Sequence, residues 1–164
     1  MGFDAIFALI VFVVASGAAA SSGTIFKPGD WYEGLKHPSW RPPNWIFPLV
    51  WTPLYAMIAA SGFIAWQAVG WSGGAAAFAV FFVQLALNFC WSWVFFGQKR
   101  PDRALAELAL LWLSILVNIL VFWPISALAG WLLVPYFIWV SFAGYLNYTL
   151  WRLNPGETGA TTAG

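Results

Sequence analysis

The chain has 164 residues, of which 62% are hydrophobic and 8% are charged, and its formal net charge is +1. Soluble domains carry about 25% charged residues, so this chain is too apolar to cover itself with a polar surface. The same composition excludes a nucleic-acid-binding protein, because no basic surface is available to follow the phosphates. A mean hydropathy of +0.76 instead predicts a chain that lies in a lipid bilayer.

Uncharged stretches predict where the chain crosses the bilayer. A spanning helix needs about 20 predominantly apolar residues. No Asp, Glu, Lys or Arg occurs in residues 5–26, 42–98 or 108–151. Turn-forming residues around 69–74 and 123–130 divide the longer stretches, so each of these holds two helices. The five predicted spans are residues 4–25, 44–68, 75–97, 103–122 and 130–152.

Two alternatives to five helices can be weighed on the sequence. Transmembrane strands would need segments of about ten residues with alternating apolar and polar side chains, and the chain lacks them. The first span could be a cleavable signal peptide, but its N-terminal end carries Asp4 and no Lys or Arg. We therefore expect an all-α membrane protein with a single five-helix transmembrane domain over residues 1–153. The small and polar C-terminal tail, residues 154–164, is expected to be disordered.

Basic residues predict the orientation of these helices. With five spans, the loop 26–43, the loop 98–103 and the C-terminus lie on one side of the membrane. The positive-inside rule makes that side cytoplasmic and places the N-terminus outside, while the choice of membrane in a two-membrane cell stays open. All seven basic residues lie on the predicted cytoplasmic side: Lys27, Lys36, Arg41, Lys99, Arg100, Arg103 and Arg152.

The predicted loop between the first two spans is rigid and aromatic. Residues 31–48 read WYEGLKHPSWRPPNWIFP and hold three tryptophans, four prolines and the only histidine of the chain. Each proline fixes its own φ and biases the preceding residue toward extended geometry. Such a loop can fold over the end of the bundle as a lid whose indoles face a flat ligand. It can equally be an interfacial connector that its tryptophans anchor, and the residues alone leave both interpretations open.

Polar side chains at membrane depth are the first candidates for function. In the third span, Gln84 and Asn88 share a helix face with Trp91, and the two amides are expected to hydrogen-bond to neighbouring helices. In the fourth span, Glu107 follows Arg103 by four residues, which predicts an ion pair at the cytoplasmic edge.

Small and aromatic residues have structural interpretations as well. Gly17 and Gly23 belong to small-xxx-small pairs in the first span, which let another helix approach closely, either in the bundle or in a homodimer. Tyr136 and Tyr148 of the fifth span fit the aromatic belt at the membrane interface. Cys90 is the only cysteine, so no intrachain disulfide is possible.

Several kinds of site are excluded by what the chain lacks. One histidine and one cysteine cannot make a metal-ligand set, and the sequence does not indicate a Cys–His dyad. The phosphate-binding patterns GxxxxGK[ST] and GxGxxG are absent. No metal and no required cofactor are therefore expected. The remaining interpretation is a helix bundle that encloses a cavity lined by indoles.

Long motifs of this chain are similar to those of one known family. They are WYEGLKHPSWRPPNW (31–45), VWTPLY (50–55), QLALNFCW (84–91), PYFIW (135–139) and LNYTLWRLN (146–154). In this order they resemble the TspO/translocator-protein family, which comprises the tryptophan-rich sensory proteins and the peripheral-type benzodiazepine receptors. The resemblance runs over nearly the whole chain, from the first span to Asn154.

The resemblance implies a five-helix bundle, commonly a homodimer, with a cavity under the first loop. Ligands of the family are porphyrins such as protoporphyrin IX or haem, sterols and synthetic benzodiazepine-site drugs, so a porphyrin is expected here as a ligand. Carried onto this sequence, the resemblance implies that the cavity is lined by Ser21, Thr24, Trp31, Phe47, Pro48, Val50, Trp51, Asn88, Trp91, Ala106, Leu110, Trp139, Ala143 and Leu146.

Two further correspondences follow from the resemblance. Leu146, Tyr148 and Arg152 match a proposed sterol-recognition pattern. Trp31 and Trp139 match the pair of family tryptophans implicated in light-dependent porphyrin breakdown. Arg103 departs from the family, because animal members tend to have Trp at this position.

Two functions stay open at this point. The first is a membrane receptor, sensor or transporter that binds a porphyrin or another hydrophobic ligand, with the loop 26–43 gating entry. The second is an enzyme that degrades protoporphyrin IX in light, with Trp31 and Trp139 as redox-active indoles. The sequence shows no acid–base or metal apparatus, which favours the binding function.

Overall fold

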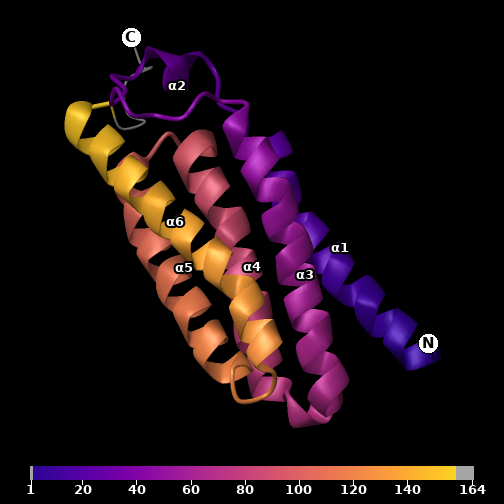
Figure 1. The fold of residues 1–164 in the computed structure, drawn as a ribbon. Coiled ribbons are helices and arrows are strands. Elements are labelled where there is room, and N and C mark those ends of the chain that lie inside the picture. The colour runs from indigo at the N-terminus through magenta and orange to yellow at the C-terminus, as the bar shows by residue number, and fades with distance from the viewer. Residues whose placement is uncertain (1, 158–164) are drawn as a thin grey trace.

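A computed structural model describes residues 2–157, and all regular elements among them are helical (Figure 1). Five of these helices are long and apolar enough to cross a membrane, which confirms the five predicted spans. Part of the predicted tail, residues 158–164, lies outside the described residues. The elements are α1 (Phe3–Ile25), α2 (Asp30–Gly34), α3 (Ile46–Gly73), α4 (Ala75–Ser92), the π-helical turn η1 (Trp93–Gly97), α5 (Pro101–Phe122) and α6 (Ala127–Leu153).

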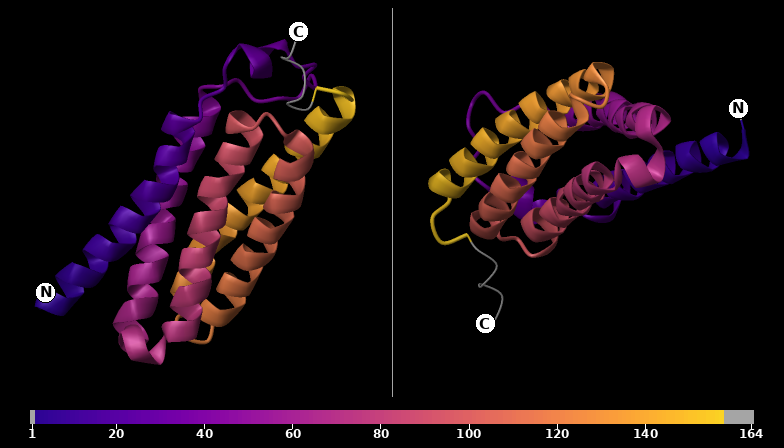
Figure 2. Two further views of the ribbon diagram at one scale, coloured as in Figure 1. Left: turned by 180° about the vertical axis from the view of Figure 1, so that it is seen from behind. Right: turned by 90° about the horizontal axis from the view of Figure 1, so that it is seen from below.

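The five long helices pack side by side as one bundle. Their contacts run in the order α1, α3, α6, α5, α4 and back to α1 (Figure 2). The connection between α1 and α3, which contains α2, crosses the end of the bundle near the C-terminus, while the N-terminal part of α1 leans away from the other helices (Figure 1). This connection, residues 26–45, is called the α1–α3 loop below. It closes one end of the bundle.

Aromatic side chains from three helices fill the core at the end of the bundle away from the α1–α3 loop. Phe81 of α4 lies edge-on to Phe12 of α1, with ring centroids 5.3 Å apart, and stacks on Phe122 of α5 at 6.0 Å. All three rings are fully buried. A Cβ atom at Gly62 of α3 would collide with the rings of Phe12 and Phe81. Glycine at this position therefore allows α1, α3 and α4 to meet around the two phenylalanines.

The helix ends differ from the predicted spans by a few residues for local reasons. The α6 helix begins at Ala127, three residues before the predicted start, because the Ser126 hydroxyl accepts a hydrogen bond from the Ala129 N–H at 3.4 Å as an N-cap. The α5 helix begins at Pro101, a residue type that fits the first helical turn. Gly70 has a φ of 64° near the end of α3, which only glycine adopts readily.

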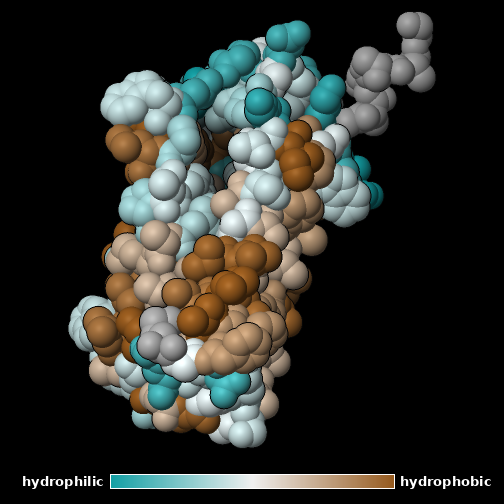
Figure 3. Space-filling model, turned by 90° about the vertical axis from the view of Figure 1, so that its right-hand side faces the viewer, coloured by the Kyte–Doolittle hydropathy of each residue, from teal (hydrophilic) through white to brown (hydrophobic). Residues whose placement is uncertain are grey.

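The face of the molecule in Figure 3 changes in hydropathy along the length of the bundle. Hydrophilic residues gather at the loop end, and hydrophobic residues dominate the middle of the face that Figure 3 shows. Side chains along the outside of the long helices include many exposed apolar residues, such as Ile10, Val14, Val83 and Leu120. These outward-facing apolar positions are suited to contact with lipid. The chain is an integral, multi-pass membrane protein.

The predicted orientation leads to a labelling result. In a Cys90→Ser background, the single variants Ser72→Cys and Lys99→Cys place thiols at opposite ends of the bundle, and both positions are exposed. A membrane-impermeant maleimide applied to intact cells should label Ser72→Cys and leave Lys99→Cys unlabelled, because the positive-inside rule predicts that the basic loops face the cytoplasm. Permeabilised cells are the control, in which both variants react. The reverse pattern in intact cells would overturn the orientation.

Candidate functional site

The α1–α3 loop is anchored to the bundle by two apolar side chains. Tyr32 of α2 and Leu35 are 4% and 6% exposed, in a segment that otherwise lies at the surface. The Tyr32 ring packs against Phe95 and Phe96, with centroid distances of 6.0 and 5.4 Å. Both phenylalanines come from the π-helical turn η1, where the extra residue per turn changes the direction in which the side chains leave the helix. The Tyr32 side chain thus fills the end of the bundle beneath the loop.

A second anchor joins the loop to the end of α6. The Lys36 N–H donates to Asn154 Oδ1 at 2.8 Å, and Asn154 Nδ2 donates to the Lys36 carbonyl at 3.0 Å. The same amide also donates to the Leu150 carbonyl at 2.8 Å, which holds the side chain against its own helix. Asn154 is 6% exposed. Its side chain therefore pairs with the backbone of the loop as a neighbouring strand would.

Charged groups on the outer side of the loop enclose Tyr32. The Arg41 guanidinium lies over the Tyr32 ring, 5.3 Å from its centroid, and Arg41 Nη1 is 2.8 Å from His37 Nε2. Arg41 Nη2 lies 3.7 Å from Glu33 Oε2, and Asn44 Nδ2 donates to Glu33 Oε1 at 2.7 Å. Burial, reinforced by the Arg41 charge, lowers the pKa of His37 below 6.5. Burial raises the pKa of the Tyr32 hydroxyl, so Tyr32 is neutral at physiological pH.

Aromatic residues of four elements meet beneath the loop, and this region is called the aromatic chamber below. Trp91 of α4 belongs to both hydrophobic clusters of the bundle, one under the loop and one in the main core. Phe47 of α3 faces Trp139 of α6 with centroids 6.0 Å apart, and Trp51 faces Tyr136 at the same distance. Eight of the residues expected at the site pack into these two clusters: Trp31, Phe47, Val50, Trp51, Trp91, Trp139, Ala143 and Leu146.

Hydrogen-bonded polar groups lie within the same region. Asn88 of α4 accepts from the Tyr55 hydroxyl and donates through Nδ2 to Tyr136 Oη at 2.9 Å, so it joins α3, α4 and α6. Trp91 Nε1 donates to Asn147 Oδ1 at 3.2 Å. Trp139 Nε1 is buried and has no acceptor among residues 2–157. The aromatic chamber thus contains an indole N–H that a bound molecule could satisfy.

Five residues expected at the site lie outside the aromatic chamber. Ser21 and Thr24 donate to backbone carbonyls of their own helix, at 2.6 and 2.8 Å. Pro48 is exposed in the first turn of α3. Ala106 and Leu110 lie on an outer face of α5, and Leu110 is 58% exposed. The structure therefore does not bring these five side chains together with the other nine.

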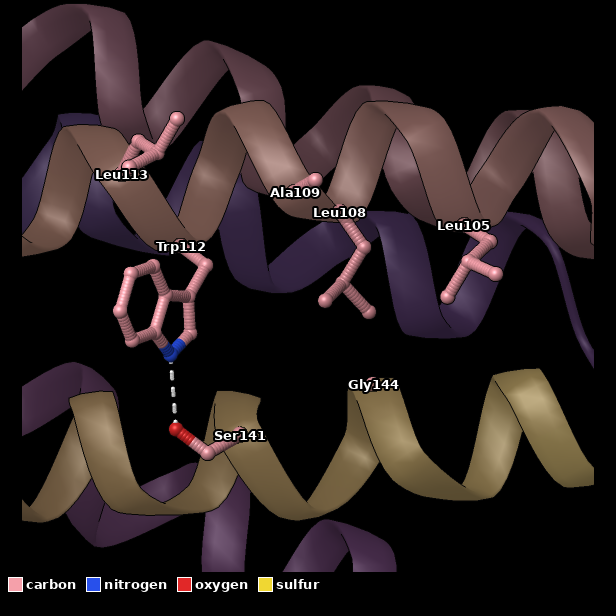
Figure 4. Close-up of a pocket in the computed structure, with 7 residues that line it drawn as sticks. All are labelled: Leu105, Leu108, Ala109, Trp112, Leu113, Ser141 and Gly144. Carbon is pink, nitrogen blue, oxygen red and sulfur yellow. Dashed lines mark hydrogen bonds between the residues drawn. The ribbon is translucent and has the colours of Figure 1, made fainter.

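A separate groove of about 560 Å³ lies between α5 and α6. Figure 4 shows its two helical walls, which a hydrogen bond of 2.8 Å from Trp112 Nε1 to Ser141 Oγ connects. None of the residues expected at the site lines this groove, which is lined by Leu105, Leu108, Ala109, Trp112, Leu113, Ser141 and Gly144. Its side chains are almost all apolar, and it carries no charged group.

Comparison with known proteins decides the family. A family model described as TspO/MBR matches residues 7–152. The chain belongs to the TspO/MBR family. It is 43% identical to protein CrtK of Rhodobacter capsulatus over 148 residues, which cover 90% of this chain and 92% of that protein. It is 42% identical to the tryptophan-rich sensory protein of Cereibacter sphaeroides (88% and 90% covered) and 34% identical to the human translocator protein (90% and 90%).

Three sequence-based interpretations of polar residues in this TspO/MBR protein are wrong. Glu107 and Arg103 form no ion pair, and both Glu107 oxygens are buried without a hydrogen-bond partner among the described residues. Gln84 is 0% exposed, and neither of its amide atoms has a partner within residues 2–157. Tyr136 is fully buried instead of lying in an interfacial belt, because it bonds to Asn88 in the core.

The tryptophan pair and the sterol pattern carried over from the family do not each form one compact group in the structure. Trp31 packs against Phe95 in the cluster under the loop, whereas Trp139 packs against the main core and also contacts Phe47 of the cluster under the loop. Of the sterol pattern, Leu146 is buried at 5% exposure while Tyr148 is 44% exposed. This pattern therefore does not form one continuous surface.

Sequence reasoning missed several residues of the site. Tyr32 and Asn154 lie inside the family motifs, yet no local pattern shows that Tyr32 is buried at the end of the bundle or that Asn154 hydrogen-bonds to the loop. Tyr55 and Asn147 bond to residues 33 and 56 positions away. A buried amide at membrane depth predicts that such partners exist, but not which helix supplies them.

Proposed function

We propose that this protein is a membrane receptor or transporter that binds a porphyrin, such as protoporphyrin IX or haem, in the aromatic chamber beneath the α1–α3 loop. The observation that carries the proposal is the set of indole and phenyl rings around Trp139, whose buried N–H has no acceptor. Flat aromatic faces suit a macrocycle, and the unpaired indole donor suits a carboxylate or carbonyl oxygen on its edge. Other flat hydrophobic ligands would use the same faces.

The α1–α3 loop would gate entry to the chamber. The rings beneath it already touch, since Trp91 stacks on Phe95 with centroids 5.2 Å apart. A macrocycle has to replace such ring contacts, so the rings and the loop above them must move when it enters. The loop is held by few polar contacts, which makes this motion less costly than separating the long helices. We place this loop on the cytoplasmic side, where the basic residues lie.

A homodimer through α1 belongs to the same proposal. Gly17 and Gly23 are exposed, and a Cβ atom built at either position meets nothing within 4 Å. The N-terminal part of α1 also leaves Phe3, Phe7 and Val14 exposed. Small residues on a transmembrane helix allow a second helix to approach closely. Crosslinking of a Gly17→Cys variant in membranes tests this interface, and its failure to dimerise would exclude α1.

Loss of one loop tryptophan tests the binding function. Porphyrin should quench the intrinsic tryptophan fluorescence of purified protein. Trp31→Phe should remove part of the quenching and weaken binding roughly tenfold, because stacking on an aromatic side chain contributes about 1–3 kcal/mol per flat base in nucleic-acid sites. Trp45→Phe is the matched control in the same loop, since Trp45 is 65% exposed and contributes to neither cluster. Equal effects of the two changes would reduce the loop to an interfacial connector.

The porphyrin-degrading activity remains a second candidate, carried by the family tryptophans Trp31 and Trp139. Porphyrin absorbance followed in light and darkness, with and without protein, separates binding from turnover. Degradation in light that requires the protein and falls in both Trp31→Phe and Trp139→Phe would establish the enzyme. The two indoles have different neighbours, since Trp31 packs under the loop and Trp139 packs against the main core, which favours two different roles in binding.

A further inference from the structure

Glu107 places a carboxyl group inside the bundle that the proposed ring contacts do not use. It lies on α5 between Ala104 and Leu111, which are 0% and 2% exposed on the inward face of the helix. Ala104 belongs to the hydrophobic cluster under the loop, and Leu111 and Tyr136 belong to the main core cluster. Tyr136 is the residue that bonds to Asn88 and faces Trp51. Glu107 therefore lies at the level of the aromatic chamber.

Both oxygens of Glu107 are buried, and neither accepts a hydrogen bond from residues 2–157. A buried carboxyl group without partners is costly in an apolar medium, because it has lost its hydrogen bonds to water and gained none in the protein. The expected neutralising partner, Arg103, makes no salt bridge with it. An ionisable side chain at this depth that is neither paired nor solvated is a candidate for direct contact with a ligand or ion.

The polar groups around Glu107 restrict what that ligand can be. The carbonyl oxygen of a carboxyl group accepts hydrogen bonds whether or not the group is ionised, so an N–H group on a ligand can satisfy it. Tyr136 Oη already accepts from Asn88 Nδ2 at 2.9 Å, and its ring position is fixed by that bond. Within the described residues there is no group of three or more His, Cys, Asp or Glu side chains suited to a metal. An N–H donor therefore fits this place better than a metal ion.

We propose that Glu107 is a polar anchor in the aromatic chamber that accepts hydrogen bonds from an N–H group of a bound hydrophobic ligand. The proposal rests on the proposed function, since it assigns a specificity-determining residue to the same chamber. Two sources share this chemistry. One is the pair of pyrrole N–H groups of a metal-free tetrapyrrole whose ring is distorted, so that these groups tilt out of the macrocycle plane. The other is the amine of a separate hydrophobic ligand. The first source predicts a preference for free-base porphyrin over haem-like metal complexes.

The porphyrin arm of the test compares two macrocycles of the same shape. Nickel protoporphyrin IX has a square-planar metal in place of the two pyrrole protons of free-base protoporphyrin IX. Quenching titrations with wild-type protein should give about tenfold tighter binding of the free base, the size expected for one hydrogen bond. The ratio should fall to about one in Glu107→Leu and to an intermediate value in Glu107→Gln, which keeps one acceptor oxygen.

The amine arm does not depend on porphyrin. Adamantylmethylamine and adamantylmethanol share one hydrocarbon frame and differ in the polar group, which is a cationic ammonium in the first and a neutral hydroxyl in the second. The rise in Tm of the detergent-solubilised protein reports their binding. The amine should raise the Tm of the wild type more than the alcohol does, and Glu107→Leu should abolish the difference. Ser114→Ala, on the same helix with its hydroxyl bonded to the Leu111 carbonyl at 2.7 Å, should behave as the wild type in both arms.

The outcomes separate the proposals. A preference in the porphyrin arm assigns the pyrrole source, and a preference in the amine arm alone assigns a separate amine ligand. No difference in either arm overturns the role of Glu107. If both Glu107 variants lose affinity for the two porphyrins equally, the proposed role of Glu107 is also overturned, because Glu107 would then be a packing residue. If neither porphyrin quenches the wild type, the proposed function fails, while the amine arm still decides the role of Glu107.

Discussion

Asn154→Ala should release the α1–α3 loop from the bundle and speed hydrogen exchange of its amides about thirtyfold. The change removes three hydrogen bonds, two to Lys36 and one to the Leu150 carbonyl, at 2.8 to 3.0 Å. The two bonds to Lys36 hold the loop and contribute about 1 kcal/mol each, so the loop should open more easily by about 2 kcal/mol. Exchange of amides that open locally follows this opening free energy, which makes the loop peptides the most sensitive measurement.

Asn44→Ala is the matched control for this experiment. It also removes an amide side chain at the loop, but its single bond runs to Glu33 within the loop at 2.7 Å and is exposed. Exchange should change less than threefold, because one exposed bond is worth well under 1 kcal/mol. Amides of α5, far from the loop, should keep wild-type rates in both variants. Unchanged loop exchange in Asn154→Ala would show that Tyr32 and Leu35 hold the loop without the amide.

The helices of this protein are predictable because the bilayer leaves few choices. Backbone groups in hydrocarbon must bond within the chain, so an apolar stretch of sufficient length becomes a helix whatever its neighbours are. The structure accordingly has α1 and α4 beginning within one residue of the predicted starts. The start of α6 is different, since it depends on one cap by Ser126 rather than on hydropathy. The length of an apolar stretch predicts neither a local helix cap nor a short helix such as α2.

The site is only partly predictable, for a different reason. Residue type and the family motifs indicate which aromatic residues gather, and most of those residues do meet beneath the loop. Polar partners are set by how the helices turn about their axes. Sequence separation of four residues made Arg103 the natural partner of Glu107, yet both Glu107 oxygens are buried and the residue shares the inward face of α5 with Ala104 and Leu111. Asn154 and Lys36 are 118 residues apart, and only the assembled bundle brings them together.

Acidification should loosen the α1–α3 loop through His37. The Arg41 guanidinium can only donate hydrogen bonds, so His37 Nε2, 2.8 Å from Arg41 Nη1, accepts and His37 is neutral in the docked loop. Protonation would place two cations in contact over Tyr32. Burial and then the Arg41 charge lower the pKa of His37 below 6.5, while the Tyr32 backbone and Glu33 oppose the shift. Tyr32, Glu33 and Arg41 are thus the groups that set this titration.

The sign of the pH dependence follows from this lowered pKa. The docked loop binds fewer protons at His37 than the open loop, in which the ordinary value of 6.5 returns. Docking is therefore fully stable above pH about 6.5, weakens as the pH falls from there to the lower pKa of the docked state, and then levels off. Within that window the opening equilibrium should rise by up to about tenfold per pH unit.

Hydrogen exchange of the loop peptides between pH 7.5 and 5, corrected for the intrinsic pH dependence of exchange, measures this opening. His37→Gln is the decisive comparison, because its side-chain oxygen accepts from Arg41 as Nε2 does but does not titrate over this range. The variant should keep a docked loop whose corrected exchange is flat with pH. Porphyrin association should accelerate at low pH in the wild type and stay constant in His37→Gln, since an opened loop admits the ligand faster. If both proteins respond to pH alike, the titrating group lies elsewhere and the contact between His37 and Arg41 does not control the gate.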